Sequence, residues 1–154
     1  MSKEVIVTAL LVIATVVAVS IFIASMLPAI YDLSDTYASI TNKLSNRIGT
    51  DIRVIFIKVN SSNVTFWAKN IGYNRISASM LNLSDVFIVS SNQSYHMTFS
   101  DSRISYNIEN GDGDDYWEYG ETLKVSINVS LDSGEYILTF VLYNGVKTSE
   151  IFSR

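Results

Sequence analysis

One short segment holds the residues of this chain that are best suited to chemistry. Residues 109–121 carry six of the 15 acidic side chains and no basic one, which leaves nine acidic against 11 basic residues elsewhere. Asn110, Asp112 and Asp114 are spaced like the first, third and fifth ligands of a calcium loop, and Glu121 falls at the twelfth position. We therefore predict a structural Ca²⁺ site with these ligands: Asn110, Asp112, Asp114, Glu118 and Glu121.

Two features separate this segment from an EF-hand. Its sixth position is Asp115, where that loop needs a glycine, and no pair of helices flanks it. A short calcium clip in a β-sandwich fits the pattern, and so does a solvated acidic turn closed by Gly120. In either case we expect Trp117 and Tyr119 to pack as a lid over the edge of the domain.

The rest of the composition excludes most catalytic classes. The chain has no cysteine and one histidine, so it lacks a thiol nucleophile, a disulfide framework and any site that needs two imidazoles. Neither a glycine-rich phosphate loop nor a Ser-His-Asp set is visible, and a net charge of −4 argues against binding to nucleic acid. We expect a protein that is not an enzyme, with no cofactor beyond the structural calcium, and with His96 at the surface or edge of a strand.

An uncharged apolar run, Val5–Leu27, needs a membrane or a helix bundle to cover it. As a helix, its 23 residues span roughly 34 Å at about 1.5 Å per residue, against a hydrocarbon core of about 30 Å. The run is longer than the apolar core of a cleavable signal, and its short leader carries one basic residue. We predict a transmembrane helix over residues 1–28, with a kink or change of direction at Pro28.

The helical pattern continues as an amphipathic stalk helix over residues 29–49. Apolar residues recur along it at steps of three and four, polar residues lie between them, and Gly49 is a stop signal. This apolar stripe packs either on the chain's own domain or on copies of itself. Small residues four apart in the membrane run also favour self-association through the helix: Ala14 with Ala18, and Ser20 with Ala24.

Residues 50–154 are expected to form an antiparallel β-sandwich of immunoglobulin-like size, so the fold class is mainly β with a long amino-terminal α-helix. About eight short segments rich in Val, Ile, Phe and Tyr are separated by turn residues. Residues 123–130 alternate strictly, with the odd-numbered apolar positions facing inward. Asn144-Gly145 predicts a two-residue hairpin loop. The expected core residues are Phe56, Phe66, Leu123, Val125, Leu138 and Phe140.

Five N-x-[ST] sequons indicate that the sandwich lies outside the cell. About two or three such matches would arise by chance in a chain this rich in Asn, Ser and Thr, so five is an excess. A surface low in Lys and Glu also suits an exterior domain. We expect a single-pass protein of the cell membrane with an extracytoplasmic β-domain, and these candidate glycosylation sites: Asn60, Asn63, Asn82, Asn92 and Asn128.

The layout resembles a known family. The apolar helix, its amphipathic continuation, the T-D-I motif within residues 48–55 and the strand 64–72 that ends in K-N-I-G resemble the archaellum accessory proteins of the archaeal flagellar operon, the G and F members, and most closely the G member. The resemblance implies a stator-like β-sandwich in the archaellum basal body and pseudo-periplasm. Such a protein links the membrane to the surface-layer protein and works with the F member in swimming motility.

The same family is built like type IV pilins, with archaellins as relatives, and this leaves other interpretations open. The protein could be a filament subunit whose helix leaves the bilayer and packs in a central bundle. Against this, no basic leader with a Gly or Ala processing site precedes the helix, and Glu4 stands too early for the fifth-position glutamate of a processed pilin. A third interpretation is an extracytoplasmic adhesion or scaffold domain without a motor role.

Overall fold

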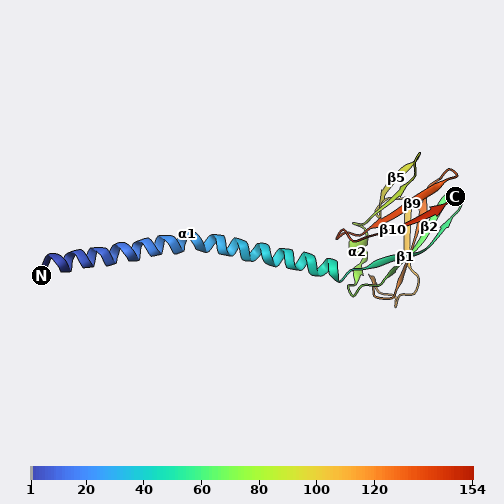
Figure 1. Ribbon diagram of the computed structural model, residues 1–154. Helices are drawn as coiled ribbons and strands as arrows, with labels where there is room; N and C mark the ends of the chain where they lie inside the picture. Colours follow the sequence, from blue (N-terminus) through green and yellow to red (C-terminus); the bar gives the residue numbers. More distant parts are fainter. Residues whose placement is uncertain (1) are drawn as a thin grey trace. The chain divides into compact units, whose positions relative to one another are not determined.

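The computed structural model describes residues 2–154, which divide into two compact units at Asn42 and Lys43. The first unit is formed by most of one long helix, α1 (Ser2–Ile48), and the last turn of this helix belongs to the second unit (Figure 1). The helix continues through Pro28 and ends directly before Gly49. None of its 47 residues is buried.

The second unit is a β-sandwich of two four-stranded antiparallel sheets. The β1 sheet has the order β1 (Ile52–Val59), β2 (Asn63–Asn70), β8 (Thr122–Asn128), β6 (Ile104–Ile108). The β10 sheet has the order β10 (Lys147–Ser153), β9 (Glu135–Val141), β4 (Asp85–Val89), β5 (Ser94–Thr98). A short ladder pairs β3 (Ile76–Ser77) with β7 (Tyr116–Trp117), and α2 (Ala78–Leu81) follows β3. The predicted fold class is confirmed.

The core lies between the two sheets and follows the period of two along each strand. In β8, the inward Leu123, Val125 and Ile127 have no exposed surface, whereas Lys124 and Ser126 face outward and stay partly exposed. Facing side chains meet across the core, where the rings of Phe66 and Phe140 lie 5.6 Å apart. Burial of these apolar side chains is the main favourable term in folding. Five of the six expected core residues are buried.

Phe56 is the exception, and its prediction was wrong. A β-bulge between Val54 and Phe56 places one extra residue, Ile55, in β1 and shifts the pairing with β2. A shift of one residue turns the following side chains to the other face of the sheet. Phe56 therefore lies opposite Trp67 on the outer face, 58% exposed, with the two ring centroids 5.4 Å apart.

The loop between β9 and β10 also differs from the prediction. The backbone N–H of Leu142 donates to the carbonyl of Val146 (2.8 Å), so the loop has three residues, Tyr143–Gly145, and not two. Gly145 closes it with φ of +78°, in the left-handed region that glycine adopts without strain. The Asn-Gly pair thus supplies the last two positions of a longer hairpin loop.

Candidate functional site

The apolar part of α1 exposes a surface on which no polar side chain depends on water for a hydrogen bond. By length and composition the helix passes as a membrane span. Each hydroxyl side chain of the apolar run donates to a backbone carbonyl one turn earlier, so no polar side chain there is left without a partner. The four bonds are Thr8 to Glu4 (2.7 Å), Thr15 to Val12, Ser20 to Val16 and Ser25 to Phe22 (each 2.8 Å).

The end of the amphipathic stripe can be compared directly with the sandwich, since both belong to one compact unit. Leu44 is 56% exposed and Ile48 is 75% exposed, so neither side chain is covered by the sandwich. The stripe was expected to pack either on the chain's own domain or on copies of itself. At Leu44 and Ile48 it does not pack on the chain's own domain. Self-association stays a prediction.

We predict that Leu44→Asp weakens self-association of the full-length protein in detergent micelles. Burying an unpaired carboxylate in a helix–helix seam costs several kcal/mol. The melting temperature of the sandwich should stay unchanged, because Leu44 does not pack on it. Analytical ultracentrifugation measures the effect, with Ser45→Asp on the polar face as the matched control. An unchanged oligomer size in Leu44→Asp would exclude the stripe as the seam.

Four of the five predicted ligands, all except Glu118, accept hydrogen bonds from backbone N–H groups in the acidic segment or directly after it. Such side-chain acceptors close tight turns by replacing the backbone partners that a turn lacks. The four bonds are Thr122 N–H to Asn110 Oδ1 (2.6 Å), Asp114 N–H to Asp112 Oδ1 (3.2 Å), Tyr116 N–H to Asp114 Oδ1 (2.8 Å) and Glu118 N–H to Glu121 Oε2 (2.7 Å).

These residues are not gathered around one point. Across residues 2–154, no group of three or more His, Cys, Asp or Glu side chains is placed to hold a metal ion. Glu121 is 9% exposed and turns its carboxylate toward Glu118, whereas Asp112 and Asp114 are exposed to solvent. The arrangement as it stands closes a turn through hydrogen bonds.

The two aromatic residues of the segment have different surroundings. Trp117 is fully buried, its ring lies 6.4 Å from that of Phe140, and its Nε1 donates to the carbonyl of Glu121 (3.0 Å). Trp117 is therefore a core residue, and its hydrogen bond to Glu121 fastens the acidic segment to the core. Tyr119 is 68% exposed and stacks on the exposed Tyr73 with ring planes 14° apart, so its prediction as a lid was wrong.

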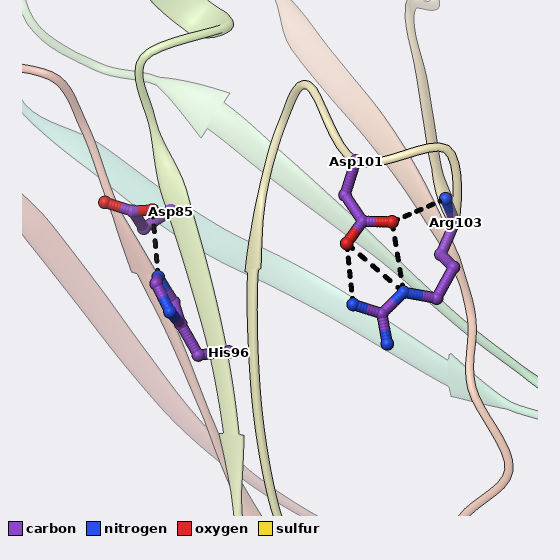
Figure 2. A network of polar contacts seen from close by, with 4 residues as sticks. All are labelled: Asp85, His96, Asp101 and Arg103. Atoms are coloured by element: carbon purple, nitrogen blue, oxygen red, sulfur yellow. Dashed lines mark hydrogen bonds and ion pairs between the residues drawn. The ribbon is translucent and has the colours of Figure 1, made fainter.

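Figure 2 shows two of the polar contacts on the surface of the sandwich, one between His96 and Asp85 and one between Arg103 and Asp101. His96 Nε2 and Asp85 Oδ1 are 3.0 Å apart across the neighbouring strands β4 and β5, and the imidazole stacks on Phe87 at 4.5 Å. His96 is exposed on an edge strand, as predicted. Arg103 holds Asp101 within one turn, and its hydrogen bonds lower the pKa of that carboxyl from 3.8 to about 2.

Replacing Arg103 by Gln should return the pKa of Asp101 toward 3.8. Because the pKa is lower in the folded state, the pair stabilises the fold above about pH 4. That contribution disappears as the pH falls toward 2. Both side chains are partly exposed, so the effect should weaken with salt. Carboxyl-carbon NMR titration measures the midpoint, and Lys124→Gln, which breaks the separate pair with Glu109, should leave it unmoved. Equal midpoints in wild type and Arg103→Gln would contradict this account.

The five sequon asparagines lie in loops or near the ends of strands and of α2. Asn63 and Asn128 pair across β2 and β8, and Asn60 begins the neighbouring turn. Asn92 lies in the loop between β4 and β5. Asn82 follows α2 and accepts from the Tyr106 hydroxyl (2.9 Å), and the hydroxyl residue of its sequon, Ser84, is buried.

Sequence reasoning missed one group of residues, which lies where the helix meets the sandwich. The T-D-I segment and the K-N-I-G segment are neighbours there, joined by backbone bonds from Ile71 and Gly72 to the carbonyl of Asp51 (2.9 and 3.0 Å). The glycine in each segment, Gly49 and Gly72, was the available sign. The two segments are 20 residues apart in the sequence. Their contact depends on the pairing of strands, so it could not be inferred from either segment alone.

Comparison with known proteins agrees with this architecture. The chain matches the archaeal-type flagellin family over residues 2–152. An uncharacterised protein of Archaeoglobus fulgidus is 48% identical over 161 aligned positions, which cover 99% of each chain.

Two solved structures share the fold. The archaellum periplasmic stator protein FlaG from Sulfolobus acidocaldarius aligns with a TM-score of 0.53 and 21% identity, over 67% of this chain and 99% of that one. A FlaG–FlaF stator complex from the same organism aligns with a TM-score of 0.51 and 20% identity, over 66% and 87%. The sandwich therefore has a FlaG-like fold, as the resemblance implied. The chain belongs to the archaeal-type flagellin family, which is a family of structural proteins and not of enzymes.

Proposed function

We propose that this protein is a membrane-anchored, stator-like component of the archaellum. α1 holds it in the cell membrane, and the sandwich lies outside and links the membrane to the surface layer. One observation carries the proposal: in a chain of the archaeal-type flagellin family, an apolar helix of membrane length has no buried residue. A surface of this kind must be covered by lipid or by other helices.

Charge and hydrogen bonding both suit a bilayer around α1. From Val5 to Tyr31 the helix has no charged residue, and Glu4 and Asp32 bound this stretch on its two sides. Within it the backbone is hydrogen-bonded as helix except at Pro28, which has no N–H to donate, and the hydroxyl side chains are satisfied internally. The FlaG-like fold of the sandwich supports an accessory role, and the solved FlaG–FlaF complex supports an F-like protein as partner.

A filament subunit is the second candidate function. The exposed stripe that ends at Leu44 and Ile48 favours it, because such a stripe could pack in a central bundle of helices. In that case the protein leaves the membrane on assembly, and α1 is covered by copies of itself. A scaffold domain without a motor role would share the anchor but would have no effect on swimming.

Fractionation of cells separates the anchor from the subunit. As an anchor, the full-length protein stays in the membrane pellet after high salt and carbonate, and external protease removes the sandwich from intact spheroplasts. Release by carbonate, or recovery in filaments sheared from the cells, would contradict a permanent anchor. A sandwich that resists external protease until the membrane is broken would contradict its exterior placement.

We make two further proposals that depend on the sandwich lying outside the cell. The first is that glycans occupy some of the sequon asparagines, for which the exposed Asn60, Asn92 and Asn128 offer the least obstructed side chains. Glycopeptide mass spectrometry would detect them. The second is that the acidic segment binds Ca²⁺, for which exposed Asp112 and Asp114 would rotate toward the ion and Glu121 would complete the shell.

The calcium proposal predicts a shift in thermal stability. Extracellular modules bind Ca²⁺ with dissociation constants of about 10⁻⁴–10⁻³ M. At one hundred times that constant, mass action adds about 2.7 kcal/mol to the free energy of unfolding. Melting of the purified protein in calcium and in chelator measures it, and Asp112→Asn/Asp114→Asn should abolish the difference. If the wild type melts at one temperature in both buffers, the segment is a solvated acidic turn.

A further inference from the structure

The structure assigns a mechanical role to the residues where α1 enters the sandwich. We call this group the clasp: Gly49–Asp51 at the end of the helix, Asn70–Asn74 after β2, and Asn144 of the last hairpin. Through it the last turn of α1 is fixed to the sandwich, so a sideways force on the sandwich reaches the base of the helix. The force-bearing part of this inference rests on the proposed stator-like function, whereas the rigidity of the clasp does not.

Backbone hydrogen bonds form the first layer of the clasp. The carbonyl of Asp51 accepts from the N–H groups of Ile71 (2.9 Å) and Gly72 (3.0 Å). Two residues further on, the N–H of Asn74 donates to the carbonyl of Gly49 (2.9 Å). The three residues between α1 and β1 are therefore bonded to the segment that follows β2, and they do not form a free linker.

Asn70 ties this layer to the core. Its side chain is fully buried, and its Nδ2 donates to the carbonyls of Asn74 and Trp117 (both 3.0 Å). Its Oδ1 accepts from the N–H of Gly72 (3.0 Å). Both N–H donors and the oxygen of one buried amide are thus hydrogen-bonded to the clasp and to Trp117 beneath the acidic segment, and an amide bonded at both ends fixes the groups around it.

A second layer holds the carboxyl end of the helix itself. The carbonyl of Asn46, which has no partner further along the helix, accepts from Asn74 Nδ2 (3.0 Å) and from the Thr50 hydroxyl (2.6 Å). Thr50 is buried, and its Oγ1 accepts from Asn144 Nδ2 (3.0 Å) in the loop between β9 and β10. The last turn is therefore held from two separate parts of the sandwich.

Two glycines let the layers come this close. A Cβ at Gly72 would lie 2.4 Å from the nitrogen of Asp51 and 2.6 Å from the carbonyl oxygen of Gly49, and both are backbone atoms that could move only if the clasp opened. A Cβ at Gly49 would lie 2.7 Å from the side-chain nitrogen of Asn74. The glycines are needed here for space and not for an unusual φ.

The clasp joins the T-D-I and K-N-I-G segments, so α1 and the sandwich are not connected by a flexible linker. Gly/Ser-rich linkers behave as random coils, so a domain joined through one would swing freely and leave its anchor unloaded. Here β1 begins four residues after α1 ends, and its first residue, Ile52, is already buried. A force applied to the sandwich must therefore break the hydrogen bonds of the clasp or turn the end of the helix.

Spin-label distances test the rigidity. The chain has no cysteine, so Ser45→Cys and Ser105→Cys, both at exposed positions, can be labelled in the full-length protein without background. Wild type should give one narrow distance distribution, and Asn74→Ala/Asn144→Ala should broaden it at least twofold with the sandwich still folded by circular dichroism. Gly72→Ala should broaden it as well, while Asn107→Ala on exposed β6 is the matched control. A broad distribution in wild type, or a narrow one in both clasp variants, would overturn the clasp.

Motility of cells that carry the same variants tests the force-bearing role. Asn74→Ala/Asn144→Ala should reach the membrane at the wild-type level and yet lower the fraction of cells that swim, whereas Asn107→Ala should not. Wild-type swimming with a loosened clasp would overturn the force-bearing role alone. Failure of the stator-like proposal looks different, because cells that lack the whole protein would then either still swim or carry no filaments.

Discussion

Trp117→Ala is expected to lower the free energy of unfolding of the sandwich by about 3–5 kcal/mol. Trp117 is among the largest fully buried side chains, and its ring packs near Phe140 in the centre of the core. The substitution leaves a cavity and also removes one of the two donors to the carbonyl of Glu121, which keeps only its hydrogen bond from the backbone N–H of Asn70. Domains of this kind are stable by about 5–15 kcal/mol, so a large share of the total would be lost.

The second tryptophan provides the control. Trp67 lies on the outer face of the β1 sheet, where it packs on Phe56 and donates to Glu109 Oε2 (2.8 Å) at the surface. Because water can replace the hydrogen bond, and both rings are already partly exposed, Trp67→Ala should cost about 1 kcal/mol or less. Urea unfolding followed by circular dichroism measures both variants. Equal losses would mean that the assignment of inner and outer faces in this sheet is wrong.

Removing residues 1–28 should transfer the protein completely from the membrane to the soluble fraction. No residue of α1 is buried, so the core of the sandwich stays intact in a fragment that begins at Ala29. Its melting temperature should equal that of the sandwich in the full-length chain. Without the uncharged run, the remaining stripe is too polar to span the bilayer.

A chain in which the order of residues 5–27 is scrambled is the matched control. Its length and composition are unchanged, so it should stay in carbonate-washed membranes as the wild type does. A fragment from Ala29 onward that remains in washed membranes would show a second attachment to the membrane. A scrambled chain that is released would show that α1 is held by specific helix contacts and not by lipid.

Much of the fold could be predicted because it depends on local periodicity. The alternation along residues 123–130 identified which side chains of β8 face the core, since a strand has only two faces. Phe56 could not be placed in this way. Its orientation follows from the bulge at Ile55, which depends on how β1 pairs with β2 and leaves no mark in the pattern of β1 alone.

The candidate sites were harder to predict than the fold. The ligand-like spacing of Asp112 and Asp114 is visible in the sequence, but a carboxylate that closes a turn has the same spacing as one that binds a metal. The role of Asn70 depends on Trp117, 47 positions later in the chain, and on strand pairing that brings the two together. Only tertiary structure distinguishes such an asparagine from a loop residue.

We propose that the protein holds the archaellum in place and does not build its filament. The most direct measurement is to delete the gene in the organism that carries it, count assembled filaments by electron microscopy, and score rotation of tethered cells. We expect filaments to assemble in normal number and rotation to be lost. Cells without filaments would contradict it in favour of a filament subunit, and cells whose filaments still rotate would contradict any role in the motor.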